Sequence, residues 1–218
     1  MKFATKKRIY MKLQISFDMT DLDQALSIAK KVNDYCDQLE VGSLMLFQFG
    51  TSAVEAFRKN FPDKTIVADT KIIDRGEEIT KIMAKAGADW ITVMGGTNKS
   101  VLYTVARAAD RYKLKVMIDL IDTDAPGQTA MDAQGFGGDA ILMHKPYDEG
   151  ESLAFLDQWD LVRGNTNLPI FIGAKIDRNN VQKVISLKPD GIIVGKSITD
   201  ADNPLQEAKY FYNLCHKE

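Results

Sequence analysis

Short apolar segments alternate with longer amphipathic segments along almost the whole chain. The short segments are rich in Val and Ile, and several are apolar on both faces, as in the strands of a fully covered parallel sheet. The longer segments carry apolar residues at helical spacing. Residues 21–33 show this spacing at Leu22, Ala25, Leu26, Ala29 and Val32. The alternation predicts a parallel sheet with right-handed helical crossovers.

The expected elements follow one another without a linker. The eight expected strands are 12–18, 38–42, 64–70, 89–94, 114–120, 139–144, 168–173 and 190–195. The eight expected helices are 21–33, a segment through Val54 and Phe57, 77–85, 100–111, 126–134, 153–162, 179–187 and 205–215. The Phe-, Met- and Leu-rich residues after the second strand are expected to form a loop. Eight repeats of ~25 residues fit a small (β/α)8 TIM barrel, and a doubly wound open sheet is the alternative architecture.

Composition indicates an ordinary globular protein of 218 residues, with 45% hydrophobic and 27% charged residues. We expect residues 11–218 to form one barrel domain and residues 1–10 to be a disordered extension. A net charge of -2 offers no basic surface for nucleic acid, and no apolar run approaches the ~20 residues of a membrane span. Cys36 and Cys215 form neither a metal-ligand motif nor a disulfide framework, so a cytoplasmic location is expected.

The most concentrated candidate chemistry is Asp69-x-Lys71-x-x-Asp74, at the end of the third expected strand. Because side chains alternate along a strand, Asp69 and Lys71 are expected to point to the same side. Inside a barrel they would share a poorly solvated pocket, where charges must be paired or bind something charged. For this segment alone, a surface ion pair at a strand-to-helix turn is an equal alternative.

Further polar residues stand at other strand ends, namely Asp18, Glu40, Asp119 and His144. In a barrel these ends meet at one mouth, where the βα loops build the site. Carboxylates at close range repel one another, and a divalent cation such as Mg²⁺ or Mn²⁺ would relieve that repulsion. A supporting or structural role is as consistent for Asp119 as a role in the site. His144 can carry a proton near neutral pH, whereas His216 is expected to be exposed and unrelated to the site.

The last two repeats carry glycine and lysine after their strands. Gly173 and Lys175 follow the seventh strand, and Gly195 and Lys196 follow the eighth. Phosphate groups in barrels often lie between these two loops, on backbone N–H groups. Either loop alone is consistent with a tight turn and a solvated lysine, but the pair favours a phosphate subsite.

These segments together resemble the orotidine monophosphate decarboxylase suprafamily. The resemblance rests on Asp69-x-Lys71-x-x-Asp74 followed by Arg75-Gly76, and on further pieces in the same order from Met11 onward. Those pieces are Asp18, 39–42, 62–71, 116–120, His144 and 194–199. Within the suprafamily the chain is similar to the 3-hexulose-6-phosphate synthases and to their sister group, the 3-keto-L-gulonate-6-phosphate decarboxylases.

The resemblance implies a homodimeric (β/α)8 lyase that uses Mg²⁺ and acts on a ketose phosphate through an enediolate. By motif position, Glu40 and Asp69 would hold the metal, and Asp18 would contact the substrate. Lys71 would stabilise the enediolate oxygens. His144 would move the proton at the reacting carbon.

The resemblance also implies that Asp74 reaches into the neighbouring subunit's site. Three residues after the histidine of strand six, the decarboxylases carry Arg, whereas this chain carries Tyr147. That difference favours the synthase, which adds formaldehyde to ribulose 5-phosphate, with the decarboxylase as the alternative. The loop 173–175 reads Gly-Ala-Lys rather than Ala-Gly-Gly, and Lys196 stands where decarboxylases carry Arg. Because of these departures, the resemblance does not identify the sugar of the substrate. A non-catalytic sugar-phosphate-binding barrel is a further alternative.

Overall fold

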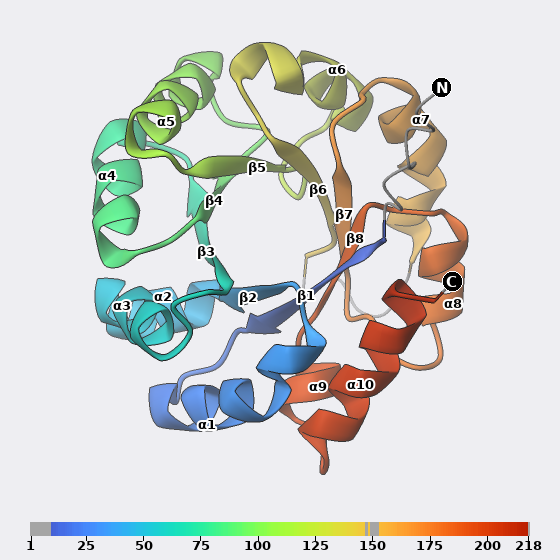
Figure 1. Ribbon diagram of the computed structural model, residues 1–218. Coiled ribbons are helices and arrows are strands. Elements are labelled where there is room, and N and C mark those ends of the chain that lie inside the picture. The colour runs from blue at the N-terminus through green and yellow to red at the C-terminus, as the bar shows by residue number, and fades with distance from the viewer. Residues whose placement is uncertain (1–9, 147, 149–152, 218) are drawn as a thin grey trace, which may run out of the picture.

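The computed structural model describes residues 10–146, 148 and 153–217. Eight parallel strands form a closed barrel, with the helices in a ring outside it (Figure 1). The strands are β1 (Lys12–Phe17), β2 (Gln38–Val41), β3 (Thr65–Ile72), β4 (Trp90–Met94), β5 (Lys115–Asp119), β6 (Ala140–His144), β7 (Ile170–Gly173) and β8 (Gly191–Val194). β1 pairs with β8, with Lys12 opposite Gly191. The predicted TIM barrel is therefore confirmed, and the open doubly wound sheet is excluded.

The helices cover the outer face of the barrel with their apolar sides. They are α1 (Leu22–Val32), α2 (Ser43–Phe49), α3 (Thr51–Asn60), α4 (Gly76–Ala86), α5 (Lys99–Tyr112), α6 (Pro126–Phe136), α7 (Trp159–Gly164), α8 (Val181–Ser186), α9 (Lys196–Thr199) and α10 (Pro204–Cys215), with 3-10 helices η1 (Asn33–Tyr35) and η3 (Ala154–Gln158). α1 shows how the sequence sets such a helix. Asp21 caps it by accepting a hydrogen bond from Gln24 N, and its apolar stripe, including Ala25 and Ile28, is buried.

Strict alternation of one strand and one helix is wrong at two places. After β2, the segment expected to be a loop forms α2, and Gly50 separates it from α3 with a φ of 59°, in the left-handed region that glycine tolerates. After β8, the residues expected to form a loop instead form the single-turn helix α9, which precedes α10. A glycine therefore separates α2 from α3, whereas residues 200–203, between α9 and α10, contain no glycine.

Residues 153–162 were predicted to form one α-helix, but the first part of this segment is the 3-10 helix η3. Its buried residues, Leu156, Trp159 and Val162, recur every three positions. Leu156 is buried from η3, whereas Trp159 and Val162 are buried from α7. The α-helix α7 begins only at Trp159.

The barrel interior is apolar on one side and polar on the other. Val67, Trp90, Met117, Leu142 and Phe171 form a buried cluster separate from the larger core between strands and helices. Polar side chains from β1 and β2, including Gln14, Gln38 and Glu40, are also buried. The alternation of side chains along β6 puts His144 on the same inward face as Leu142. The apolar cluster thus lies below the groups at the barrel mouth.

His216 was expected to be exposed, but its side chain is largely buried. Its ring stacks on Tyr212 with 3.8 Å between centroids, and its side chain is 20% exposed. Its Nδ1 donates to the Tyr212 carbonyl, and its Nε2 lies 3.4 Å from Asp37 Oδ1. Asp37 also accepts a hydrogen bond from Leu13 N, so the C-terminal turn is packed against the start of β1. Aromatic stacking one helical turn apart explains the difference.

Cys36 and Cys215 are both buried free thiols. In the described ranges, none of the helices combines the length and the apolar character that crossing a membrane requires.

Candidate active site

A cavity of about 460 Å³ opens at the carboxyl ends of the strands. The predicted residues that line it are Asp18, Glu40, Asp69, Lys71, His144, Gly173, Lys175, Gly195 and Lys196. Residues from distant parts of the sequence meet there because all eight strands run in the same direction. The barrel therefore brings the predicted metal, proton-transfer and phosphate residues to one place.

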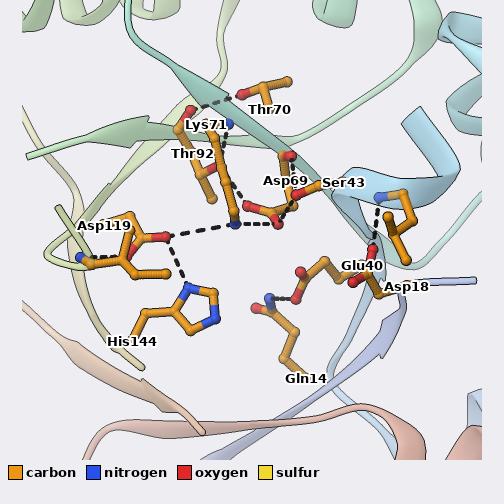
Figure 2. A network of polar contacts seen from close by, with 12 residues as sticks. Gln14, Asp18, Glu40, Ser43, Asp69, Thr70, Lys71, Thr92, Asp119 and His144 are labelled. Atoms are coloured by element: carbon orange, nitrogen blue, oxygen red, sulfur yellow. Dashed lines mark hydrogen bonds and ion pairs between the residues drawn. The ribbon is translucent and has the colours of Figure 1, made fainter. Parts of the chain in front are cut away.

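An ion pair between Asp69 and Lys71 lies at the centre of this cavity (Figure 2). Lys71 Nζ is 2.5 Å from Asp69 Oδ2 and 3.8 Å from Asp119 Oδ2. Burial alone would raise the pKa of Asp69, but Lys71 and a hydrogen bond from Ser43 outweigh it and lower the pKa. Burial alone would lower the pKa of Lys71, but Asp69 and Asp119 outweigh it and raise the pKa. Both groups are therefore charged at neutral pH.

The expected alternation of β3 does not explain how this pair forms. The β3–β4 register shifts between Ala68 and Ile72, and Lys71 has a φ of 44°, in the left-handed region. A bulge in β3 therefore sets the direction of the Lys71 side chain. The prediction that the two side chains meet is correct, but the regular strand on which it rested is not.

Glu40 is the second buried carboxylate of the cavity. Its Oε2 accepts a hydrogen bond of 2.5 Å from Gln14 Nε2. Burial, followed by the negative charge of Asp69, raises the pKa of Glu40 to about 7. The ionised form of Glu40 is thus unfavourable in free energy, and a nearby cation would stabilise it.

Glu40 and Asp69 fit a divalent cation. Within the part of the chain that the structure describes, no group of three or more His, Cys, Asp or Glu side chains has metal-binding geometry. Mg²⁺ usually takes one or two carboxylates and completes its shell with water and substrate oxygens, so two carboxylates suffice. Burial first, and then the negative charge of Asp69, raise the pKa of Glu40, and a bound cation would favour its ionised form.

His144 is held by Asp119, whose carboxylate is fully buried. His144 Nδ1 donates to Asp119 Oδ2 at 3.0 Å, and Asp119 Oδ1 accepts from Ile121 N. Because an ionised carboxylate only accepts, this contact places a proton on Nδ1 and leaves Nε2 on the ring side away from Asp119 (Figure 2). Burial would lower the pKa of His144, but Asp119 outweighs it and raises the pKa. Asp119 lies behind the cavity and contacts both His144 and Lys71.

Asp18 stands at the rim of the cavity, beside α2. Its Oδ1 accepts a hydrogen bond of 2.8 Å from Leu44 N. A Cβ built on Gly42 would lie 2.5 Å from that same oxygen, so only glycine allows this approach. Gly42 therefore lets Asp18 sit against the start of α2.

The loops after β7 and β8 border the same cavity and are joined to each other. Ser197 Oγ donates to the Ile176 carbonyl at 2.6 Å. Lys175 has a φ of 33°, and its carbonyl accepts from Asn180 Nδ2. A lysine thus occupies a backbone conformation usually taken by glycine, in a loop that faces the cavity.

One predicted site residue, Asp74, lies apart from the cavity. Asp74 is exposed on the turn between β3 and α4, and it is not among the cavity-lining residues. Tyr147, on which the choice between the two sister groups rested, lies outside the described residues.

The sequence analysis missed Ser43, Thr92 and Gln14. Ser43 and Thr92 hydroxyls donate to the two oxygens of Asp69, at 2.6 and 2.9 Å. Thr92 could have been found, because the alternation of β4 turns it inward beside Asp69. Ser43 could not, because it belongs to a segment predicted to be a loop.

Asp119→Asn should lower the pKa of His144, because burial would then act without the opposing charge. The raised folded-state pKa means that His144 stabilises the fold below its unfolded value near 6.5, and that this contribution is lost as pH rises through the folded-state pKa. The measurement is the NMR titration of the His144 ring, with Asp124→Asn as an exposed control. An unchanged midpoint in Asp119→Asn would show that Asp119 does not set the charge of His144.

Comparison with known proteins agrees with this geometry. Residues 11–211 match the Orotidine 5'-phosphate decarboxylase / HUMPS family. The 3-hexulose-6-phosphate synthase of Bacillus subtilis (strain 168) is 30% identical over 208 residues, which cover 94% of this chain and 98% of the relative.

Solved structures give the same result. The 3-hexulose-6-phosphate synthase from Salmonella typhimurium superimposes with a TM-score of 0.89 and 29% identity, over 94% of this chain and 98% of that one. The 3-keto-L-gulonate-6-phosphate decarboxylase from Vibrio cholerae O1 superimposes with a TM-score of 0.81 and 25% identity, over 93% of this chain and 97% of that one. Because the family match spans nearly the whole barrel, the chain belongs to the Orotidine 5'-phosphate decarboxylase / HUMPS family.

Proposed function

We propose that this protein is a Mg²⁺-dependent aldehyde-lyase, a 3-hexulose-6-phosphate synthase that adds formaldehyde to ribulose 5-phosphate. The observation that carries the proposal is the Asp69–Lys71 ion pair, which shares one cavity with Glu40 and His144. Relatives and solved structures of that activity support the choice of reaction. The domain is proposed to span residues 11–218 and to work in the cytoplasm, in keeping with its two buried free thiols.

The chain's own groups account for the proton and charge movements. His144 Nε2 accepts a proton from C1 of ribulose 5-phosphate, and the C1–H electron pair forms the enediolate. Asp119 stabilises the resulting imidazolium. The Lys71 ammonium would stabilise the negative charge that develops on the substrate oxygens. C1 then attacks the formaldehyde carbon as the C2 carbonyl of the ketose re-forms, and the formaldehyde oxygen receives the proton from His144.

Glu40 and Asp69 would hold Mg²⁺, which supplies positive charge to the oxygens of the bound ketose. Asp18 would contact the sugar hydroxyl groups from the rim. The phosphate would lie between the loops after β7 and β8, near Gly173, Lys175, Gly195 and Lys196, all of which border the cavity.

A paired assay tests this proposal against the sister reaction. One arm supplies ribulose 5-phosphate with formaldehyde and follows formaldehyde loss, and the other supplies 3-keto-L-gulonate 6-phosphate and follows CO₂ release. The similarity to the Vibrio cholerae decarboxylase makes the second arm the main alternative. EDTA-sensitive formaldehyde loss as the faster reaction is expected. Faster CO₂ release would make the protein a decarboxylase, and two silent arms with phosphate-ester binding would favour a non-catalytic barrel.

Lys71→Ala should lower kcat by about 1,000-fold, because removal of one preorganised charge from a buried site typically costs 100- to 1,000-fold and Lys71 also pairs with Asp69. Asp69→Ala should be similarly inactive. Both variants should keep the circular dichroism spectrum of the wild type. Lys59→Ala, on the exposed side of α3, is the matched control and should keep wild-type turnover. Wild-type turnover in a folded Lys71→Ala variant would sink the assignment.

Glu40→Gln should stabilise the metal-free protein at pH 8. With a folded-state pKa of about 7 against 4.5 for the ordinary group, the stability that neutral Glu40 provides is complete below pH 4.5 and lost as pH rises through 7. The gain in free energy of unfolding should be on the order of 1–3 kcal/mol in EDTA. Mg²⁺ should raise the Tm of the wild type but not of Glu40→Gln. An equal Mg²⁺ response in both proteins would remove Glu40 from the ligand set.

The protein is also proposed to be a homodimer in which Asp74 completes the partner's site. The exposed apolar side chains Leu44, Phe47 and Ile73 support this, with exposed fractions of 49%, 91% and 64%. They lie on α2 and on the β3–α4 turn that carries Asp74. Large apolar side chains exposed on neighbouring elements are typical of an interaction site.

Phe47→Glu should convert a dimer into a monomer of 24.3 kDa, measured by analytical ultracentrifugation, because it places a charge in the proposed interface. The control is Met131→Glu, an exposed apolar residue on α6, at the top of Figure 1 and away from α2 at the left. A wild-type monomer, or a Phe47→Glu dimer, would contradict the proposed interface.

A further inference from the structure

The ladder between β3 and β4 is interrupted at the point where the candidate chemistry begins. Ala68 pairs with Ile91, and the next paired residues are Ile72 and Val93. Three residues of β3, Asp69–Lys71, therefore lie opposite Thr92 alone. A regular parallel ladder would have placed one residue there, so the extra residues need other hydrogen-bond partners.

Thr92 provides a partner for each of these three residues. Its carbonyl accepts a hydrogen bond of 2.7 Å from Thr70 Oγ1. Its hydroxyl accepts from Lys71 N at 2.9 Å and donates to Asp69 Oδ1 at 2.9 Å. Figure 2 shows the Thr92 side chain between the backbone of Lys71 and the carboxylate of Asp69.

The hydroxyl is used in both directions at once, as an acceptor and as a donor. A hydroxyl group can do this, whereas a methyl group of the same size can do neither. Thr92 is 2% exposed, so water cannot readily take its place. Lys71 needs the support, because its φ of 44° is unfavourable for a residue with a Cβ.

We propose that Thr92 is a positioning residue, whose hydroxyl holds Asp69 and Lys71 in their reacting geometry by accepting the Lys71 N–H at the interrupted ladder and by donating to the Asp69 carboxylate. It touches neither the cavity nor the substrate, because it is absent from the cavity lining and acts only through the two residues it binds. The consequence for catalysis rests on the proposed function, whereas the consequence for the Lys71 backbone does not.

The test compares Thr92→Val, which keeps the shape but removes the hydroxyl, with Thr92→Ser, which keeps the hydroxyl. Thr92→Val should lower kcat by about 100-fold, since small misplacements of reacting groups cost that much. KM for ribulose 5-phosphate should change less than about threefold, because the phosphate loops are untouched. Thr92→Ser should restore kcat to within about threefold of the wild type.

Thr80→Val is the matched control for loss of a buried threonine hydroxyl. Thr80 is fully buried on α4, and its hydroxyl donates to the Gly76 carbonyl, away from the cavity. It should fold and keep the wild-type kcat. If Thr92→Val does not fold, Thr92→Ala replaces it, with the same expected loss of kcat.

Wild-type kcat in folded Thr92→Val or Thr92→Ala would overturn the proposal, as would an equal loss in Thr92→Ser. If the wild type turns over neither ketose phosphate, the proposed function fails, and the crystal structure of Thr92→Val decides the positioning role. A Lys71 that has left the left-handed region, with its ammonium withdrawn from Asp69, would support the role. An unchanged Asp69–Lys71 pair would overturn it.

Discussion

Two opposite charges, on Asp69 and Lys71, meet 2.5 Å apart in the mouth of the barrel, and the neighbouring groups are arranged around them. Charges in such a poorly solvated place persist only when they are paired and hydrogen bonded. Ser43 and Thr92 satisfy the oxygens of Asp69, and Asp119 adds a second carboxylate near Lys71. The pair thereby keeps an ammonium fixed where the proposed reaction develops negative charge.

The remaining carboxylates divide into two roles according to what faces them. Asp119 lies between the Lys71 ammonium and the His144 ring and holds that ring in place. Glu40 instead faces Asp69, and burial together with the charge of Asp69 raises its pKa to about 7. The negative charge of Glu40 and Asp69 favours a bound cation. The hydrogen bond between Asp119 and His144 instead serves the proposed proton transfer. The apolar cluster beneath both keeps them close to the mouth, where a substrate can reach them.

The sequence predicts the barrel well because its strongest signals are local and repeated. Val- and Ile-rich strands separated by amphipathic helices leave few alternatives, and parallel strands bring their carboxyl ends together. The sites of error are the positions where tertiary contacts override a local pattern. The bulge in β3, with Lys71 in the left-handed region, depends on Thr92 from another strand. The packing of His216 combines stacking on Tyr212, one helical turn away, with a contact to Asp37, far away in the sequence.

The same distinction applies to the candidate site. Residues at strand ends, such as Glu40 and His144, could be named from the sequence because topology alone places them. The division of work between them could not, since it follows from distances of a few ångströms. Asp119 illustrates this, because its pairing with His144 and Lys71 becomes visible only in three dimensions.

The central claim is that this cavity removes a proton from C1 of a ketose phosphate. The most direct test follows the C1 hydrogens of ribulose 5-phosphate by proton NMR in D₂O, with Mg²⁺ and without formaldehyde. The account predicts that the wild type exchanges one C1 hydrogen for deuterium, and that Lys71→Ala and His144→Ala do not. Retention of both C1 hydrogens with the wild type would contradict the enediolate and the role of His144.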